Sequence, residues 1–459
     1  MTHRNVELVA VGAGPSNLAL AVALEELAPP ELAASTLLLE SNDEVAWQPG
    51  MLLPWTRSQV SFLKDLVTMR NPQSGFSFVS YLHATGRLND FVNLGQSTPY
   101  RQEISGYLSW VAGALQRVRI EFGRRATSVT PQRDADGRVS GWLLTLADGS
   151  TIGCRYLVIG AGRDAEVPAV FRDLPRERVI HSTWYSAATE RLDPAAPHRV
   201  AVIGGAQSAA EMLWATHRRF PQAECTMVMR SIGPTAYGSS KFVNELYYPG
   251  FVDEFYAAGA AARGQVLAQM HQTNYAGLAP DLLENLYHEI YLEKLAGRQR
   301  LRLATMTDVL AARTDGDDVV LTLHDRLHDR QHELRCDVVM LGTGFVRELP
   351  RLVRGLTDAL GLDAPEVSRN YRLQTGTGSQ TGFYEPGAAY LQGVNEATHG
   401  IADSLLSVLA ARAGDIADDL LGHRRVRALP AAPRPASSTE TVLTVPTESE
   451  GELLWTSAV

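Results

Sequence analysis

Two glycine-rich turns contain the residue types that hold phosphate groups in proteins. In the first, VAVGAGPSN, an apolar run leads into Gly12 and Gly14, and a helical pattern opens at Pro15. Gly12 permits a sharp exit from a strand, and Gly14 lets the backbone approach a pyrophosphate without an intervening Cβ. The helix from Pro15 points its N–H groups at the anion. Asn17 holds the third position of the spacing, where glycine is usual. These four residues predict a dinucleotide site, with a plain structural turn as the alternative.

An acidic residue follows the first turn at the place where a ribose would lie. Glu40 closes the apolar run STLLLE, and a carboxylate there accepts hydrogen bonds from ribose hydroxyls. Its separation from Gly12 is longer than the usual spacing, which the loop APPELAAS explains. Glu40 is therefore our candidate for the ribose contact.

The second turn, VIGGAQSAAE, has the same form, but its two glycines are adjacent. Gly204 takes the first position, Ala206 stands where a second glycine is expected, and Gln207 and Ser208 offer hydrogen bonds. Arg230 ends the next predicted strand, where NADPH-specific proteins place a cation for the 2′-phosphate. These five residues predict an NADPH site. A solvated strand end is the alternative for Arg230.

Two dinucleotide sites in one chain predict hydride transfer from a nicotinamide to a flavin. The three cysteines, Cys154, Cys225 and Cys336, form no C-x-x-C pair, which argues against a disulfide reductase and a zinc site. A flavin monooxygenase is then the leading class. HDRLHDRQH places three histidines at helical spacing, but the flanking runs read as strands, so we expect a hairpin and no metal site.

Strand–helix–strand units must position both turns. Residues 5–11, 15–28 and 35–40 predict the first unit, and 199–230 predicts the second. The fold class is therefore α/β, with two Rossmann-like dinucleotide-binding domains and a smaller, mostly helical substrate segment. An internal echo between 148–162 and 329–344 suggests two strands that each return to the first domain. The predicted domains are 1–190 (FAD, first part), 191–240 (NADPH, first part), 241–300 (helical substrate segment), 301–340 (NADPH, return strands), 341–425 (FAD, second part) and 426–459 (disordered tail).

Composition excludes several other functions. The chain has 459 residues, 45% of them hydrophobic, and a net charge of −9. The acidic balance argues against nucleic-acid or membrane-surface partners. No signal peptide or long apolar stretch is evident, so we expect a cytoplasmic protein.

One block is highly specific for a known family. WQPGMLLPWTRSQVSFLKDLVTMRNPQSGFSFVSYLHATGRLNDFVN, residues 47–93, resembles the signature of the microbial N-hydroxylating flavin monooxygenases. These are the L-ornithine N5- and L-lysine N6-monooxygenases of siderophore biosynthesis. RNPQSGFSF and ATGRLNDFVN are more similar to the ornithine branch. The resemblance continues in HSTWY (181–185), KFVNELYYP (241–249), QTNYAGL (272–278), LGTGF (341–345) and NEATHGIADSLLSVLA (395–410).

The resemblance implies roles for residues that no spacing argument would single out. Lys64 matches the anchor of the substrate carboxylate. Asn244 matches the asparagine at the nicotinamide and substrate edge, and Asn274 matches a second contact to the substrate backbone. Ser407 matches the residue beside the reactive amine. The remaining matches are Trp47, Gln59 and Leu405 near the flavin, and Arg230 and Tyr275 at NADPH. The chain departs from the family pattern at Ala206, which replaces a glycine, and at Gln48, where histidine is common.

The resemblance also implies a reaction and its partners. NADPH reduces FAD, O2 gives a C4a-hydroperoxyflavin, and the neutral side-chain amine of L-ornithine attacks it. We expect no catalytic acid–base pair; positioning and exclusion of water should provide the rate. The family suggests a homo-oligomer, a dimer or a tetramer. L-lysine, or a diamine without a carboxylate, is the alternative substrate, although Lys64 argues against the diamine. A non-catalytic flavin-binding protein is a further alternative, favoured only by Ala206.

Overall fold

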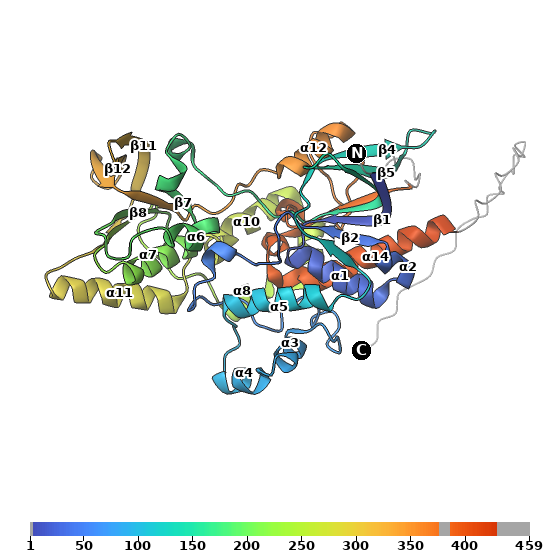
Figure 1. Ribbon diagram of the computed structural model, residues 1–459, viewed down its shortest axis with the longest axis horizontal. Helices are drawn as coiled ribbons and strands as arrows, with labels where there is room; N and C mark the ends of the chain where they lie inside the picture. Colours follow the sequence, from blue (N-terminus) through green and yellow to red (C-terminus); the bar gives the residue numbers. More distant parts are fainter. Residues whose placement is uncertain (1–2, 376–385, 429–459) are drawn as a thin grey trace, which may run out of the picture.

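The computed structural model describes residues 3–375 and 386–428 and folds into two lobes (Figure 1). The first lobe, at the right of Figure 1, is built on a seven-stranded sheet in the order β3-β2-β1-β6-β5-β4, with β15 also paired to β6. The strands β3, β2, β1, β6 and β15 are parallel, whereas β5 and β4 form an antiparallel extension. The strands span β1 (His3–Val11), β2 (Thr36–Leu39), β3 (Arg119–Glu121), β4 (Ala126–Arg133), β5 (Val139–Leu146), β6 (Thr151–Ile159) and β15 (Ala388–Leu391).

Helices cover both faces of this sheet. On one face α1 (Pro15–Leu27) packs against α14 (Leu409–Ala428) and α5 (Arg101–Ala114), and their apolar residues share one core. On the other face α12 (Arg351–Leu360) packs on β4. Leu18, Leu20 and Leu24 are completely or almost completely buried in α1, so the helix that carries the first turn is fixed by its core contacts.

The second lobe contains a fully parallel five-stranded sheet. Its order is β10-β9-β8-β14-β7. Helices α7 (Gln207–Arg219) and α11 (Pro280–Leu295) pack on one face, and a three-stranded antiparallel sheet packs on the other. The strands span β7 (Val179–His181), β8 (Arg199–Ile203), β9 (Glu224–Val228), β10 (Leu301–Ala304), β11 (Thr307–Asp315), β12 (Asp318–Asp325), β13 (Arg330–Cys336) and β14 (Val338–Leu341).

The two lobes confirm the predicted fold class but correct three details of the predicted organisation. Strand β7 pairs with β14 in the second sheet, so the predicted boundary at residue 190 is wrong. Strand β14 pairs with β7 and β8, so only β6 of the two echoed strands belongs to the first sheet. The chain returns to the first sheet through β15 instead. The echo arises because β6 and β14 each lie beside the strand that leads into a glycine-rich turn.

The range 241–300 is helical, but its last helix belongs to the second lobe. Helix α11 buries Leu282 and Leu286 against the second sheet. The smaller segment between the lobes therefore consists of α8 (Lys241–Glu245), α9 (Pro249–Ala257) and α10 (Ala260–Asn274). Both α9 and α10 contact α13 (Glu396–His399), which lies in the chain just after β15.

The remaining expectations concern the hairpin and the tail. Strands β12 and β13 are antiparallel, which confirms the hairpin; His324 and His328 contact different aspartates, Asp329 and Asp325. Helix α14 runs to Ala428, and the rest of the predicted tail, 429–459, lies outside the described residues. No helix among the described residues is long and apolar enough to cross a membrane.

Candidate active site

The first glycine turn has the shape of an anion cradle. Gly12 adopts φ +93°, and a Cβ there would lie 2.7 Å from the carbonyl oxygen of Gly160. Gly14 caps the N-terminus of α1, and a Cβ on it would meet nothing within 4 Å. Free N–H groups of the helix terminus thus face open space at Gly14, which fits the pyrophosphate of a dinucleotide.

Asn17 supports this turn from within the protein. Its side chain is completely buried, and Nδ2 donates to the carbonyl oxygens of Val11 at 2.9 Å and Gly12 at 2.8 Å. Its Oδ1 accepts from Gln392 Nε2 at 2.8 Å. The glycine that close packing requires instead lies just after the adjacent strand β6, because a Cβ on Gly160 would come within 2.9 Å of Asn17. Asn17 therefore leaves only its backbone for a direct contact with a dinucleotide.

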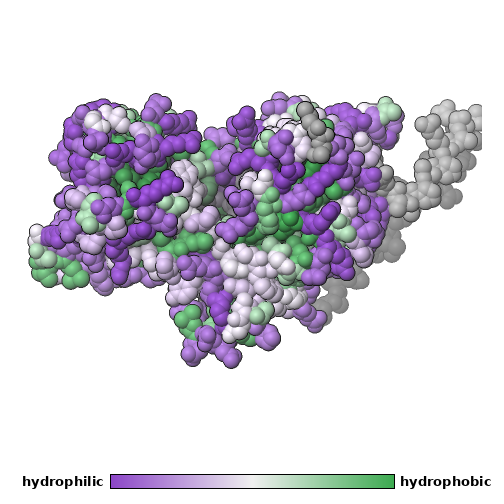
Figure 2. All heavy atoms as spheres, viewed as in Figure 1, coloured by the Kyte–Doolittle hydropathy of each residue, from purple (hydrophilic) through white to green (hydrophobic). Residues whose placement is uncertain are grey.

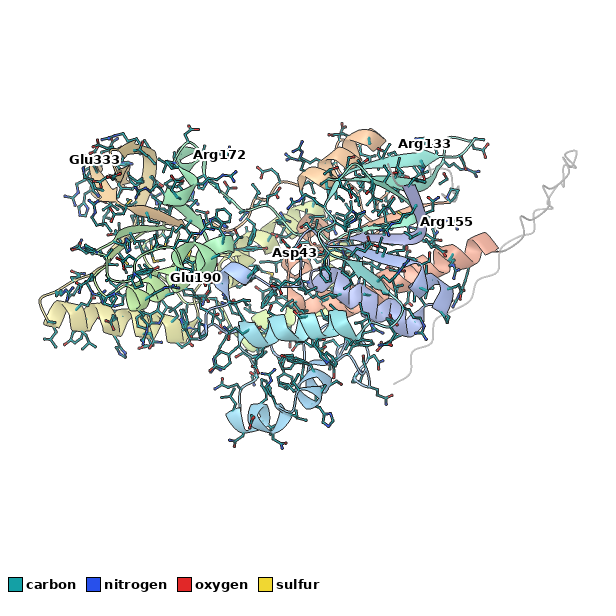
Figure 3. The ribbon with its side chains drawn as sticks, in the orientation of Figure 1. Asp43, Arg133, Arg155, Arg172, Glu190 and Glu333 are labelled. Carbon is teal, nitrogen blue, oxygen red and sulfur yellow. The ribbon has the colours of Figure 1, made fainter. Side chains whose placement is uncertain are left out.

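Glu40 lies directly beside the turn. Its Oε2 accepts the Ala13 N–H at 2.9 Å, and its Oε1 accepts from Asn42 Nδ2 at 2.7 Å. Figure 3 places Asp43, a little further along the same loop, between the two lobes, whereas Arg133 and Arg155 lie toward the outer end of the first lobe. The carboxyl end of the parallel strands thus faces the second lobe, as expected for a ligand site of this fold.

The second glycine turn is built in the same way. Gly204 adopts φ +134°, and a Cβ there would lie 2.5 Å from the carbonyl oxygen of Gly342. Ala206 caps α7 in an extended conformation, so its methyl group causes no backbone strain. Gln207 is already engaged: its Oε1 accepts the Ala279 N–H at 2.8 Å, and its Nε2 donates to Glu211 at 2.8 Å. Ser208 is half-buried beside it, and Arg230 is exposed just after β9.

A buried ion pair joins the two lobes next to this turn. Arg101 on α5 donates from both terminal nitrogens to the two carboxylate oxygens of Glu211 on α7, at 2.7 Å each. Burial raises the pKa of Glu211 above its usual range, although Arg101 opposes that shift. The pair therefore connects the second turn to the first lobe.

Lys64 occupies a partly buried position between the first lobe and the α8–α10 segment. Its Nζ lies 4.1 Å from the centre of the Tyr248 ring, a cation–π contact. Burial lowers the pKa of Lys64 below its usual value. Lys64 lines a small cavity together with Tyr107 and Leu406. The predicted carboxylate anchor is thus next to the segment that contains Ser407.

Tyr247, which precedes Tyr248 in the chain, contacts both α8 and α10. Its N–H donates to the carbonyl oxygen of Asn244 at 3.1 Å, and its hydroxyl is hydrogen-bonded to Thr273 Oγ1. Asn274 follows directly at the end of α10 and is half-buried, whereas Asn244 on α8 is exposed. Tyr247 therefore connects the two segments that contain the predicted substrate asparagines.

Tyr275 connects the end of α10 to the first lobe. Its hydroxyl donates to Glu396 Oε2 at 2.8 Å and lies 3.3 Å from Ser404 Oγ. Burial raises the pKa of Tyr275 to about 12, so it is a phenol at neutral pH. Leu405 follows Ser404, and Ser407 Oγ is buried with no hydrogen-bond partner among the described residues. A buried hydroxyl of this kind fits a bound ligand group.

These contacts form a closed ring. It runs from Lys64 to Tyr248 and Tyr247, and on to the end of α10 and the 404–407 segment. It returns through Leu406 to the cavity that this residue and Lys64 both line. The ring contains or adjoins all four predicted substrate residues and two of the predicted cofactor residues: Lys64, Asn244, Asn274 and Ser407, with Tyr275 and Leu405. The other two predicted flavin-side residues are less directly connected. The Trp47 N–H donates to Ser105 Oγ at 3.1 Å, and Gln59 is exposed next to Val60, which lines the cavity of Lys64.

Sequence reasoning missed the residues that hold this segment against the first turn. Arg412 pairs with Asp403 at 3.0 Å, and both side chains are fully buried. Arg412 also donates to Ser16 Oγ at 2.7 Å, within the first turn. Asp403 accepts the Asn395 N–H at 2.7 Å. No spacing rule joins residues 396 positions apart, and only the buried charge on α14 could have drawn attention to Arg412.

One cluster outside this site has metal-ligating residue types. His217, Glu289 and Glu293 bring their ligand atoms within 4.8 Å of one another in the second lobe. Arg300 donates to His217 Nε2 at 3.0 Å and pairs with Glu293 at 3.3 Å. A metal ion would have to displace this guanidinium, so the cluster is explained as a buried ion-pair network.

The fold and the two turns define the class of proteins with two dinucleotide-binding domains, to which flavin monooxygenases belong. Residues 4–347 match the family L-lysine 6-monooxygenase/L-ornithine 5-monooxygenase. The chain is 37% identical to an L-ornithine N(5)-monooxygenase of Pseudomonas aeruginosa over 91% of this chain and 94% of the relative. It therefore belongs to this family, as its sequence predicted.

Two solved structures are similar over nearly the whole chain. The ornithine hydroxylase PvdA from Pseudomonas aeruginosa superposes with a TM-score of 0.84 at 36% identity, covering 92% of this chain and 100% of PvdA. The Kutzneria ornithine N-hydroxylase KtzI, solved with reduced FAD, NADP+ and L-ornithine, gives 0.83 at 33% identity, with the same coverage. The ornithine branch is thus the part of the family to which the chain is most similar among these relatives.

Proposed function

We propose that the protein hydroxylates the side-chain amine of L-ornithine at N5, using FAD, NADPH and O2, for the biosynthesis of siderophores or related hydroxamates. The observation that carries the proposal is the ring of contacts around Lys64 and Ser407. Three observations support it: Lys64 shares a cavity with Leu406, the neighbouring Ser407 Oγ is buried without a hydrogen-bond partner among the described residues, and Arg412 ties this segment to Ser16 in the first turn.

The residues of the two turns suit the two cofactors. FAD would lie along Gly12 and Gly14 with its ribose at Glu40, and NADPH would lie at Gly204 with its 2′-phosphate near Arg230. Reduced FAD supplies the means to activate O2, which the side chains of this site do not. The cavity of Lys64 is lined mainly by apolar side chains, and exclusion of water from such a pocket would protect a reactive oxygen species from decay.

The substrate groups have matching partners in the ring. Lys64 provides a compact positive charge for the α-carboxylate. Asn244 and Asn274 offer neutral donors and acceptors for the α-ammonium and carboxylate. Ser407 Oγ would hydrogen-bond the distal nitrogen. Because burial disfavours an ammonium, a closed pocket favours the neutral amine whose lone pair the reaction needs.

The proposal also covers the cellular location and the oligomeric state of the protein. All three cysteines are buried and free, which suits a reducing cytoplasm. We also propose that the enzyme works as a homo-oligomer, a dimer or a tetramer.

The test is product formation with three substrates in parallel. The FAD-loaded protein, NADPH and O2 should convert L-ornithine to a hydroxylamine, with NADPH consumption matched to product. L-lysine should give less product, because one added methylene must fit the same pocket, and putrescine still less, because it lacks the carboxylate. A higher kcat/KM for lysine or putrescine than for ornithine would contradict the proposed substrate.

A further inference from the structure

Helix α11 has a second apolar face that the fold does not use. Its inner face buries Leu282 and Leu286 against the second sheet. On its outer face Tyr287 is 71% exposed, Tyr291 57% and Leu295 74%. These three residues are spaced by four, so they form one stripe along the helix.

The stripe is part of a larger exposed apolar surface. Leu292, beside the stripe, is 55% exposed, and Leu303 on the adjacent edge strand β10 is 38% exposed. Figure 2 shows hydrophobic atoms gathered at the left end of the second lobe, where α11 lies in Figure 1. Contiguous apolar patches of this kind, rich in tyrosine, mark protein interfaces more often than bare solvent surface.

The charges on the same face are self-complementary. Glu284, at the N-terminal end of the stripe, has a 75% exposed side chain, and Lys294, at its C-terminal end, is also exposed. Arg298 follows just after the helix. If two such helices pack antiparallel with a twofold axis near Tyr291, then Tyr287 of one faces Leu295 of the other. The acidic end of each helix then faces the basic end of its partner, and the helix dipoles oppose.

We propose that this α11 surface, formed by Glu284, Tyr287, Tyr291, Lys294 and Leu295, binds the same surface of a second copy of the chain. The contact is isologous, as expected for a twofold interface. A membrane surface does not suit the face, because interfacial helices carry a mainly basic polar side whereas the protein is acidic overall. The proposal rests on the proposed homo-oligomeric state and is independent of the proposed chemistry.

The experiment measures mass and activity of the full-length, FAD-loaded protein by sedimentation equilibrium and hydroxylamine formation. The wild type should have at least twice the 50.0 kDa mass of one chain. Tyr291→Glu places two like charges at the twofold axis and should weaken the association at least 30-fold, giving half the wild-type mass. Leu327→Glu, at a 69% exposed leucine in the β12–β13 turn of the same lobe, is the matched control and should keep the wild-type mass.

A charge exchange tests the antiparallel arrangement itself. With the axis at Tyr291, Glu284 faces Arg298 of the second copy. Glu284→Arg alone should therefore weaken the association, and the double variant Glu284→Arg/Arg298→Glu should restore it. A monomeric wild type, an unchanged mass for Tyr291→Glu, or a double variant weaker than the single one would overturn the proposal, as would a monomer that instead binds a different protein through α11. Hydroxylation is scored separately, so an inactive but dimeric protein would refute only the proposed function.

Discussion

Replacing Glu211 with glutamine removes the charge of the ion pair between the lobes but keeps the size of the side chain. In the protein Arg101 makes two 2.7 Å contacts with Glu211, and the two side chains are only 9% and 1% exposed. Glu211→Gln leaves the Arg101 charge buried without a counter-ion, which costs about 3–5 kcal/mol. Because Arg101 lies on α5 and Glu211 on α7, much of this cost opposes the docked arrangement of the lobes. The ratio of docked to undocked molecules should fall by a factor of about 100 or more.

The assay is rapid-mixing reduction of bound FAD. We expect Glu211→Gln to slow reduction by NADPH at least tenfold while dithionite reduces the flavin normally. Glu26→Gln is the matched control, because the 2.6 Å pair of Glu26 with Arg70 lies within the first lobe; it should lower stability without slowing reduction. The double variant Arg101→Met/Glu211→Leu should recover much of the rate, since an apolar pair removes the unpaired charge. A wild-type reduction rate in Glu211→Gln, or an equal loss in Glu26→Gln, would refute the reasoning.

Three further predictions concern single positions. Ser407→Ala should not lower thermal stability, because Ser407 Oγ has no hydrogen-bond partner among the described residues, but should lower kcat/KM for ornithine about tenfold; a loss of stability without a loss of kcat/KM would contradict this. Ala206→Gly should lower the KM for NADPH a few-fold in steady-state assays, because the second turn then lets backbone approach phosphate. It should also cost up to about 1 kcal/mol of stability, because glycine loses more conformational freedom on folding. An unchanged or higher KM would show that the methyl group is no obstacle. Burial lowers the pKa of His399 from 6.5 to about 4, so its contribution of about 3 kcal/mol is complete above pH 6.5 and is lost as the pH falls to 4. His399→Gln should therefore reduce the fall of the denaturation midpoint between pH 6.5 and 4. A fall of the midpoint as steep as that of the wild type would contradict the assignment.

The local features of the fold were predictable from the sequence. The first turn, its helix and Glu40 are fixed by short-range signals: an apolar run, two glycines, a proline at the first helical position and an acidic strand end. The structure places them as predicted, with the Ala13 N–H donating to Glu40. The hairpin around His328 was predictable for the same reason, because alternating apolar strands flank a polar turn.

The sheet to which a strand belongs was not predictable from these signals. Strands β7 and β14 are short apolar runs, and their place in the second sheet depends on pairing with each other and with β8, which local pattern does not encode. The echo of β6 in β14 suggested a common sheet, whereas it reflects a common position beside a glycine turn.

The candidate site, too, was only partly predictable from the sequence. Lys64 and Ser407 could be proposed only from the family resemblance, because a lone lysine or serine has no distinguishing spacing. The buried pair of Arg412 with Asp403, which holds the Ser407 segment to the first turn, was missed because its partners come from distant parts of the chain. The structural role of Asn17 was also not predictable, since the glycine that accommodates it is Gly160, which follows the distant strand β6.

The central claim is that Lys64 and the flavin serve one pocket, and steady-state hydroxylation by Lys64→Met tests it most directly. Methionine keeps much of the stem but removes the charge, so a lost charge-assisted hydrogen bond to the α-carboxylate of about 1.5–3 kcal/mol should lower kcat/KM for ornithine about 10- to 150-fold. Reduction of FAD by NADPH should be unchanged, as should kcat/KM for putrescine, which has no carboxylate. An unchanged kcat/KM for ornithine, or an equal loss for both substrates, would contradict the account.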